Sequence, residues 1–471
     1  MTLLTGTLAC LASFGTMTAE QTPAPIAEVE RYVRAELARQ RIPGLSVAIL
    51  RGDRLVLARG YGYANLEHRV KATDSTVYQV GSVTKQFTAA AVVLLSEQGR
   101  LGLDNPITRY LPEGDSVWQG VTIRHLLTHT SGIPEISDTL HWWRRDYTES
   151  ELVRLAATQP LGFVPGASWR YSSIGYTLLG VIVHRVSGVP WGDFLRDRVF
   201  RPLGMRTARV NSDAAIVPNR AAGYEFVNDT LKNQWWASPT VTAMADLGLS
   251  LSVHDLVRWT IGLDQGEVLS RAALEASWTP ARLVSGASIP YGLGWHLSQQ
   301  RGYRRFGHGG SWQGFWTTIQ RYPEFGLTVV VFANLAQANP ESIAFGIAGL
   351  LEPALKAPHL LTMPLLGTTP PQPVDRLLAD IVAGRDSAKV SPGLRAVTPP
   401  AGREQIGRWL EAINSWTFLG CDAVGDRRIS RLGAQVQQIC YAKGAAKGGG
   451  ILFSILYDAG WRATGIDLYF L

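Results

Sequence analysis

The chain is poor in lysine and in cysteine. Only seven of its 471 residues are lysine, against thirty-eight arginines, so a lysine within a chemical motif stands out. The three cysteines, Cys10, Cys421 and Cys440, form no cluster with the spacing of a metal site, which excludes a cysteine-ligated metal centre. Cys421 and Cys440 fit two alternatives, a disulfide in an oxidising compartment or two small core residues in a reducing one.

Long apolar runs are also missing, and no segment is suited to span a bilayer, so we expect no integral membrane span in the mature protein. Residues 2–19 are apolar, small and uncharged, and they resemble the apolar part of an export signal with a cleavage point after Ala19. The basic residues that usually precede such a part are absent, and a lipid anchor on Cys10 is an alternative. We expect a periplasmic or secreted protein.

Blocks of consecutive basic residues are absent as well, although the net charge is +7 and the isoelectric point is about 9.3. We interpret the excess charge as arginine scattered over the surface, and we expect no nucleic-acid partner. Hydrophobic residues make up 46% of the chain and charged residues 18%, as in ordinary globular proteins. The length allows two or three domains.

A serine and a lysine stand three residues apart in Ser82-Val-Thr-Lys85, at the front of the apolar segment Phe87–Leu95. If that segment is a helix, the two side chains lie on one face and can meet. A serine hydroxyl becomes a nucleophile when a neighbouring base takes its proton, and a buried lysine can be that base. The alternative is a serine that only caps the helix.

A tyrosine could supply a proton partner for Lys85. Tyr171-Ser-Ser173 is a polar segment that leads into an apolar helix. A tyrosine next to the lysine could share its proton, so that a base becomes available near neutral pH. The alternative is an ordinary half-buried tyrosine.

A glycine-dense segment, His308-Gly309-Gly310-Ser311, comes immediately before an expected strand. Consecutive glycines let a ligand approach the backbone, and N–H groups there can face a developing oxyanion. His308 could hydrogen-bond a substrate carbonyl or carboxylate. The alternative is a hairpin turn with a surface histidine.

Two histidines four residues apart, His125 and His129, could hold a metal on a helix. Leu126 occupies the place of the glutamate base in zinc hydrolases, and a turn at Thr130–Pro134 follows. We therefore predict a structural loop here rather than a metal site.

Strand patterns occur at both ends of the first 350 residues and bracket a helical middle part. This order predicts an α/β domain with an antiparallel sheet and an inserted helical part. The expected strands are Gly44–Leu50, Arg54–Tyr61, Tyr291–Leu297, Trp312–Gln320 and Leu327–Ala333, with helices at Ile26–Arg41 and from Ser82 to about Gly99.

A proline-rich stretch at 357–373 predicts a linker. Beyond it, residues 374–384 and 403–413 have helical patterns, and three or four antiparallel strands are expected from Phe418 to Leu471. This order predicts a small α+β domain at 374–471.

Taken together, these motifs resemble the serine penicillin-recognising hydrolases, which include class C β-lactamases, penicillin-binding carboxypeptidases, esterases and D-aminopeptidases. The resemblance covers about residues 25–355 and implies a β-lactamase/transpeptidase-like domain at 25–356 with an all-helical subdomain. The similar segments are Val80–Thr88, His125–Pro134, Tyr171–Gly180, Pro202–Met205 and His308–Gly310.

The resemblance implies a role for each motif. Ser82 attacks a carbonyl carbon and becomes acylated, while Lys85 and Tyr171 handle the proton. The N–H groups of Ser82 and Ser311 form the oxyanion hole, and no metal or organic cofactor is required. The remaining substrate-facing residues would be Ser173, His308, Gly309 and Gly310.

Two residues depart from the family pattern. Ser173 replaces the usual asparagine, and His308 replaces the usual lysine, so a substrate carboxylate would meet a neutral or partly charged partner near pH 7. We therefore predict an acyl-enzyme hydrolase of small-molecule or peptide esters and amides, with weak β-lactam turnover at most. The alternatives are a DD-peptidase or weak β-lactamase acting on cell-wall peptides, and a non-catalytic protein that binds peptidoglycan or β-lactams. The sequence leaves the oligomeric state open.

Overall fold

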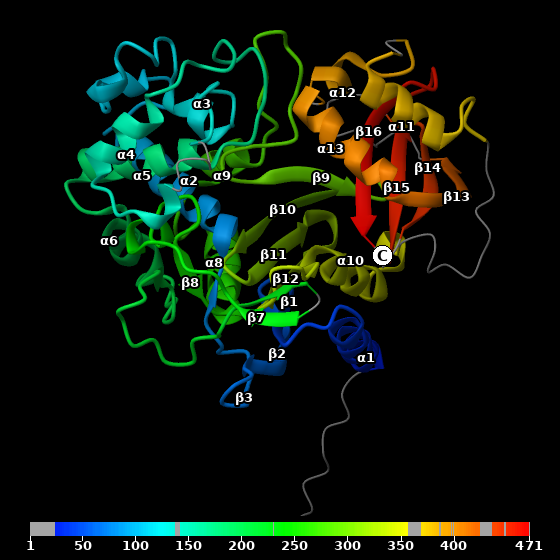
Figure 1. Cartoon of the computed structure of the whole chain (residues 1–471), viewed down its shortest axis with the longest axis horizontal. Coiled ribbons are helices and arrows are strands. Elements are labelled where there is room, and N and C mark those ends of the chain that lie inside the picture. Colours follow the sequence, from blue (N-terminus) through cyan, green and yellow to red (C-terminus); the bar gives the residue numbers. More distant parts are fainter. Residues whose placement is uncertain are drawn as a thin grey trace, which may run out of the picture.

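The computed structural model describes residues 24–136, 142–228, 230–356, 369–385, 388–396, 398, 400–423, 436–446 and 449–470. A large domain and a smaller C-terminal domain lie side by side (Figure 1). In these ranges no helix has the length and apolar character needed to cross a membrane. The predictions for residues 2–19, for Cys10 and for most of the proline-rich stretch fall outside the described residues.

The large domain contains helices and strands in alternating groups. Its helices are α1 (Ala24–Arg39), α2 (Thr84–Glu97), α3 (Ile123–Leu127), α4 (Glu149–Ala156), α5 (Ser173–Ser187), α6 (Trp191–Leu195), α7 (Pro239–Thr242), α8 (Val253–Gln265), α9 (Arg271–Ser277) and α10 (Pro340–Leu351). Its strands are β1 (Gly44–Arg51), β2 (Arg54–Asn65), β3 (Val70–Lys71), β4 (Tyr78–Gln79), β5 (Arg209–Val210), β6 (Tyr224–Val227), β7 (Thr230–Asn233), β8 (Leu249–Leu251), β9 (His296–Gln300), β10 (Tyr303–Trp312), β11 (Phe315–Tyr322) and β12 (Leu327–Ala333).

The main sheet joins the two ends of this domain. Its strand order is β3-β2-β1-β12-β11-β10-β9, and neighbouring strands are antiparallel. β1 therefore pairs with β12, although more than 270 residues separate them. The helical part between β4 and β9 lies to one side of the sheet (Figure 1). The predicted α/β fold, with an antiparallel sheet and an inserted helical part, is confirmed.

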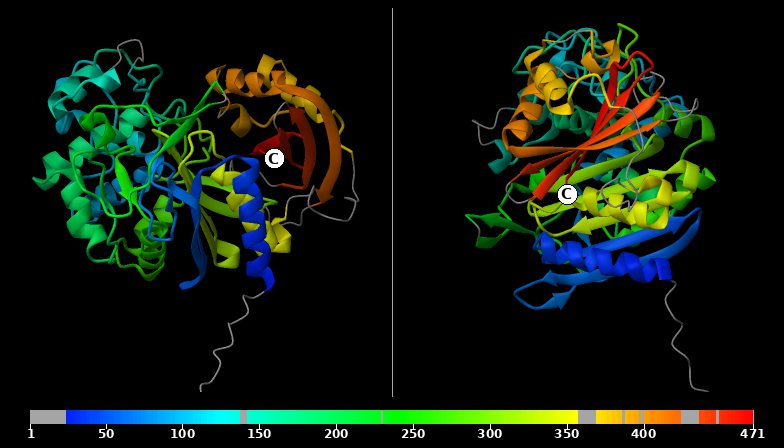
Figure 2. Two further views of the ribbon diagram at one scale, coloured as in Figure 1. Left: turned by 60° about the horizontal axis from the view of Figure 1, so that its bottom comes forward. Right: turned by 90° about the vertical axis from the view of Figure 1, so that its right-hand side faces the viewer.

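The centre of the sheet is covered on both faces. In β1, Leu45, Val47 and Ile49 belong to the core that α1 and α10 complete, while Ala48 and Leu50 belong to the core that α2 and α8 share. Successive strand residues point to opposite faces, so a nearly continuous apolar strand fits this position. Figure 2 shows α1 and α10 packed together against one side of the sheet.

The glycine-dense segment lies elsewhere than the sequence suggested. We expected it immediately before a strand, but His308 and both following glycines are inside β10, and the turn to β11 is at Gln313 and Gly314. The hydrophobic pattern missed this strand because glycines lower the strand signal. Tyr291, the expected start of a strand, makes only an isolated bridge with His296.

The C-terminal domain is a four-stranded antiparallel meander with helices on one side. Its elements are α11 (Val374–Ala383), α12 (Pro392–Ala396), α13 (Pro400–Glu411), β13 (Ile413–Ala423), β14 (Gln438–Ala446), β15 (Gly449–Tyr457) and β16 (Ala463–Phe470). A disulfide joins Cys421 and Cys440, which face each other on β13 and β14. Ile439, Leu452 and Phe345 of α10 share a small apolar cluster, so this domain packs against the large one.

Candidate active site

Ser82 lies in a single 3-10 turn, Gly81–Val83, directly before α2. The N-cap of α2 is Val83, so Ser82 does not occupy the capping position that the sequence left open as an alternative. Its side chain is half-buried, and its Oγ lies 3.0 Å from Nζ of the fully buried Lys85. The three-residue spacing therefore brings the two groups into hydrogen-bond contact.

Lys85 uses all three N–H donors of an ammonium group. Its Nζ donates to Ser82 Oγ, to Ser173 Oγ at 3.4 Å and to the backbone carbonyl of Asp246 at 3.0 Å. The Asp246 carboxylate lies 3.8 Å from the same nitrogen, and both side chains are almost inaccessible to water. The serine thus shares its lysine with a buried acid.

Asp246 was missed by the sequence analysis. The acid lies 161 positions from Lys85 and matches no motif, although it is the one charged residue in the otherwise apolar and small segment Ala243–Leu251. Burial raises the pKa of Asp246, while the nearby Lys85 charge opposes this rise. An isolated acid in such a segment is the signal that could have identified it.

One face of α2 holds the Asp246 segment in place. Thr88 Oγ1 donates to the Ala245 carbonyl at 2.6 Å, and Thr84 Oγ1 accepts the Leu249 N–H at 3.2 Å. On the other side, Gly180 of α5 leaves room for Ala245, since a side-chain carbon at Gly180 would lie 2.3 Å from the Ala245 methyl carbon. The acid is therefore fixed between α2 and α5.

Tyr171 lies beside the lysine with its ring rather than its hydroxyl in contact. Lys85 Nζ lies 5.0 Å from the Tyr171 ring centre. The ring is packed between His129, at 4.3 Å, and His296, at 5.9 Å between centres. Within the described residues, its hydroxyl makes no hydrogen bond to Ser82 or Lys85. The structure thus brings Tyr171 to the site without a preformed proton path.

His308 is buried, and both its ring nitrogens have protein partners. Nδ1 lies 2.6 Å from the Gly309 carbonyl, and Nε2 lies 2.9 Å from the Tyr291 hydroxyl. Because a carbonyl only accepts, Nδ1 carries the proton and Nε2 accepts from Tyr291. Burial holds the pKa of His308 well below its usual range, so the ring is neutral near pH 7. In this arrangement His308 supports the wall of the site and is not a cation facing a substrate.

The two histidines near α3 serve the backbone. His125 Nδ1 accepts the Thr122 N–H in a capping box, and His129 Nδ1 accepts the Ser172 N–H at 3.1 Å. Burial holds the pKa of His129 well below its ordinary value. Among the described residues, no group of three or more histidines, cysteines and acids is arranged to hold a metal.

Close backbone contact between β10 and the Ser82 turn forms the wall of the site. A side-chain carbon at Gly310 would lie 2.0 Å from the Val80 carbonyl, and one at Gly81 would lie 2.7 Å from the Ser311 nitrogen. Gly81 also has a φ of +52°, which favours glycine. The backbone of Ser311 is thereby held against that of the Ser82 turn, so that two N–H groups can face one substrate oxygen.

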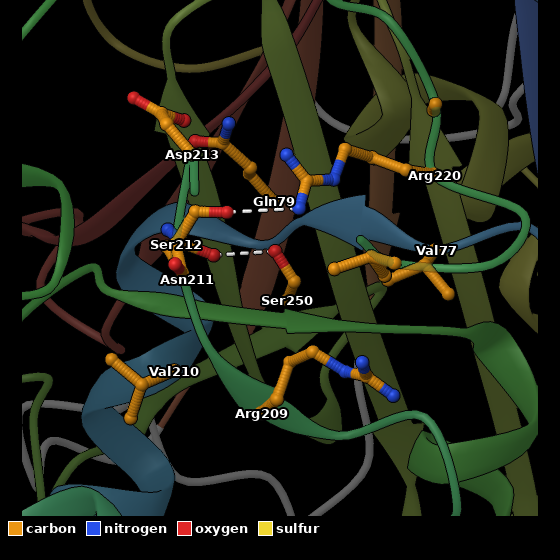
Figure 3. Close-up of a pocket in the computed structure, with 11 residues that line it drawn as sticks. Val77, Gln79, Arg209, Val210, Asn211, Ser212, Asp213, Arg220 and Ser250 are labelled. Atoms are coloured by element: carbon orange, nitrogen blue, oxygen red, sulfur yellow. Dashed lines mark hydrogen bonds between the residues drawn. The ribbon is translucent and has the colours of Figure 1, made fainter. Parts of the chain in front are cut away.

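A separate pocket lies at the small sheet formed by β4, β8 and β5 (Figure 3). Its polar groups pair with each other: Ser250 donates to the Asn211 side chain, and Arg220 donates to the Ser212 carbonyl at 2.8 Å. None of the residues around Lys85 lines it. This pocket is therefore distinct from the serine–lysine site.

Comparison with known proteins identifies the family of the large domain. Residues 29–347 match the family described as Beta-lactamase. Penicillin-binding protein 4* of Bacillus subtilis is 31% identical over 311 residues, which cover 61% of this chain and 67% of that protein. The chain spans about two thirds of the length of the curated relatives it matches.

Two solved structures extend the comparison to the fold. The octameric penicillin-binding protein homologue from Pyrococcus abyssi aligns with a TM-score of 0.60 at 23% identity, covering 95% of this chain and 98% of that one. A D-stereospecific amidohydrolase from Streptomyces aligns with a TM-score of 0.59 at 25% identity, covering 69% and 98%. The first alignment covers both domains, and the second covers a share close to that of the large domain. The chain therefore belongs to the beta-lactamase family of serine hydrolases, which act through an acyl-enzyme intermediate.

Proposed function

We propose that this protein hydrolyses esters, amides or peptides through an acyl-enzyme on Ser82. The observation that carries this proposal is the 3.0 Å contact between Ser82 Oγ and the buried Lys85 Nζ, next to the backbone of Ser311. A half-buried hydroxyl in such a place is accessible to a substrate, and its oxygen accepts a hydrogen bond from the lysine nitrogen.

The proposed reaction has two halves. Ser82 Oγ bonds to the substrate carbonyl carbon, its proton passes to the Lys85 and Tyr171 pair, and the pair returns a proton to the leaving alcohol or amine. The N–H groups of Ser82 and Ser311 stabilise the negative oxygen. Water then attacks the ester and gives up a proton through the same groups, which releases the acid and restores Ser82.

The surroundings of His308 favour neutral acyl groups over substrates recognised by a carboxylate. The ring is neutral and its nitrogens are engaged, so it offers no charge to the carboxylate of a β-lactam or a cell-wall peptide. We propose that esters and amides are turned over faster than cephalosporins. Cell-wall DD-peptidase activity and ligand binding without turnover are the competing functions.

A substrate panel separates these functions. A chromogenic acetate ester, a D-amino-acid p-nitroanilide and a chromogenic cephalosporin are compared with wild type and with the Ser82→Ala variant. Turnover of the ester or anilide that disappears in the variant supports the proposal. Rapid cephalosporin turnover would favour a β-lactamase, and no serine-dependent turnover of any substrate would favour a binding protein.

Tyr171→Phe tests the proton path. Removal of a group that transfers the serine proton should lower turnover about a hundredfold or more, the usual effect of losing a general base. Tyr291→Phe is the control for loss of a nearby buried hydroxyl, because that hydroxyl contacts His308 and not the serine. Near-normal turnover by Tyr171→Phe would remove the tyrosine from the mechanism.

We also propose that the chain is exported and consists of a hydrolase domain at 25–356, a linker at 357–373 and an accessory domain at 374–471. The apolar residues 2–19 and the Cys421–Cys440 disulfide support export. Mass spectrometry of the N-terminal peptide, after expression in a bacterium with an export pathway, should find a start after Ala19. A retained first segment in the purified protein would contradict export by cleavage.

A further inference from the structure

Lys85 contacts a second serine and a buried acid in addition to Ser82. Its three hydrogen bonds to Ser82, Ser173 and the Asp246 carbonyl saturate an ammonium group, and the Asp246 carboxylate lies 3.8 Å away. A neutral amine has only two N–H groups, so one of the two serine hydroxyls would have to donate to the nitrogen instead of accepting from it. What favours the charged form of the lysine is the buried Asp246 carboxylate at 3.8 Å.

Asp246 needs the lysine in return. Its side chain is 2% exposed, and a buried carboxylate without a cation is strongly destabilised. Among the described residues, Lys85 is its ion-pair partner, and Thr177 Oγ1 donates to Oδ1 at 3.2 Å. Loss of either charge would leave the other buried without compensation.

Other titratable groups surround this pair but differ from Asp246 in charge or in contact. His129 and His308 are buried and neutral near pH 7, so they add no charge. Glu135 accepts the Ser173 N–H at 2.5 Å and lies farther than ion-pair distance from Lys85. The groups that face the pair are Ser82 from the 3-10 turn, Glu135 and His129 from the segment after α3, Tyr171 from the segment before α5, Ser173, Tyr176 and Thr177 from α5, and His308 from β10.

We propose that Asp246 is a positioning residue whose carboxylate holds the Lys85 ammonium beside Ser82 and sets the pH at which the serine reacts. The proposal rests on the proposed function, since it assumes that Ser82 is the nucleophile. It adds a functional position to Ser82, Lys85, Tyr171 and Ser311. Asp246 contacts the Lys85 nitrogen and acts on Ser82 through that lysine.

The direction of the pH effect follows from the charge. A nearby carboxylate favours the ammonium, so its removal lowers the pH at which Lys85 loses its proton. If the neutral amine is the base, the acid limb of the rate profile moves to lower pH. If the ammonium is required, the alkaline limb moves to lower pH. In both cases, the limb that reports Lys85 moves in the same direction, by about one to three pH units.

The experiment measures the second-order rate of Ser82 labelling by a fluorophosphonate from pH 5 to 10, which requires no knowledge of the substrate. The full chain is compared as wild type, Asp246→Asn, Asp246→Glu and Glu135→Gln. Asp255→Asn is the matched control, because Asp255 is also buried but bonds to Ser252 and Thr207. We expect the Lys85 limb to move only in Asp246→Asn and to stay near its wild-type position in Asp246→Glu.

The outcomes separate the proposal from the function on which it rests. Absence of labelling in the wild type overturns both. Labelling of the wild type with an unmoved limb in Asp246→Asn, or an equal shift in Glu135→Gln, overturns the role of Asp246 alone. If Asp246→Asn does not fold, Thr177→Val replaces it. That variant removes a hydrogen bond that stabilises the ionised form of Asp246, so less negative charge faces Lys85. The Lys85 limb of the rate profile should therefore also move to lower pH, and an unmoved limb overturns the proposal.

Discussion

At Gly310, the backbone of β10 passes so close to the turn holding Ser82 that a side chain has no room. Gly310→Ala would place a carbon 2.0 Å from the Val80 carbonyl and 2.8 Å from the Ser82 nitrogen, so β10 and the Ser82 turn must separate. We expect the fluorophosphonate labelling rate to fall about a hundredfold or more, the scale for loss of an oxyanion donor.

Gly309→Ala is the matched control for this substitution. A side-chain carbon there would meet its nearest neighbours, the Thr317 carbonyl and Trp316 Nε1, at 3.8 and 3.9 Å, which are ordinary contacts. We expect its labelling rate to stay within a few-fold of wild type. Equal losses in the two variants would show that the close approach at Gly310 is not what shapes the site.

The spacing of Ser82 and Lys85 in the sequence predicted their contact, but nothing in the sequence pattern predicted Asp246 beside them. Ser82 and Lys85 are local, so helical spacing alone brings them together. Asp246 reaches Lys85 only because α2 and α5 fix a distant segment, and such a contact leaves no pattern in a single sequence. The hydrogen bonds of His308 with Gly309 and Tyr291 depend on tertiary packing, so its neutral, buried state could not be predicted either.

At the scale of elements, an ion pair ties the turn at Pro112–Gly114 to α5. Arg185 donates two hydrogen bonds to Glu113, at 2.6 and 2.9 Å, and these lower the pKa of Glu113 from 4.5 to about 2. A carboxyl group whose pKa is lower in the folded state stabilises the fold at pH values above its pKa in the unfolded state. This stabilisation is lost as the pH falls from about 4.5 towards 2.

Glu113→Gln should therefore lower the urea midpoint at pH 7 and reduce the loss of stability between pH 5 and 2. Glu275→Gln is the control, since its pair with Arg271 is exposed and within one helix. Urea unfolding across this pH range measures both. An unchanged acid dependence in Glu113→Gln would show that the pair does not couple the turn to α5.

Element boundaries were predicted best where the hydrophobic period was regular. β1, β2, α1 and β12 occur close to their expected ranges, because the core on both faces requires apolar residues there. β10 was not predicted because its glycines have low strand propensity. At Gly310, glycine is required by the close approach to the Ser82 turn. The order of strands in the sheet was also beyond the sequence, since the β1–β12 pairing closes a very long loop.

The whole molecule consists of two domains with separate cores, and the C-terminal core contains the Cys421–Cys440 disulfide. The sequence separation of 19 between these cysteines corresponds to a stabilisation of about 3 kcal/mol in the chain-entropy picture. Thiol titration of the unfolded, unreduced protein should find both blocked, and prior reduction should expose both. Free thiols at both positions in unreduced protein would contradict the bond.

The existence of a helix-then-sheet domain after residue 373 could be predicted from composition and alternation. Its contact with α10 through Phe345 could not, because one apolar residue on a helix surface does not identify its partner. The octameric homologue from Pyrococcus abyssi aligns over both domains, which makes the two-domain arrangement of this chain comparable with a solved protein.

The most direct test of the whole account is the identity of the residue that a fluorophosphonate modifies. Wild-type protein is incubated with the probe at about pH 7.5, where a general base with a pKa near neutrality is active. The labelled peptide is then sequenced by mass spectrometry. We expect one stoichiometric adduct on Ser82, and none on any peptide of Ser82→Ala. An adduct on another serine, or equal labelling of the variant, would contradict it.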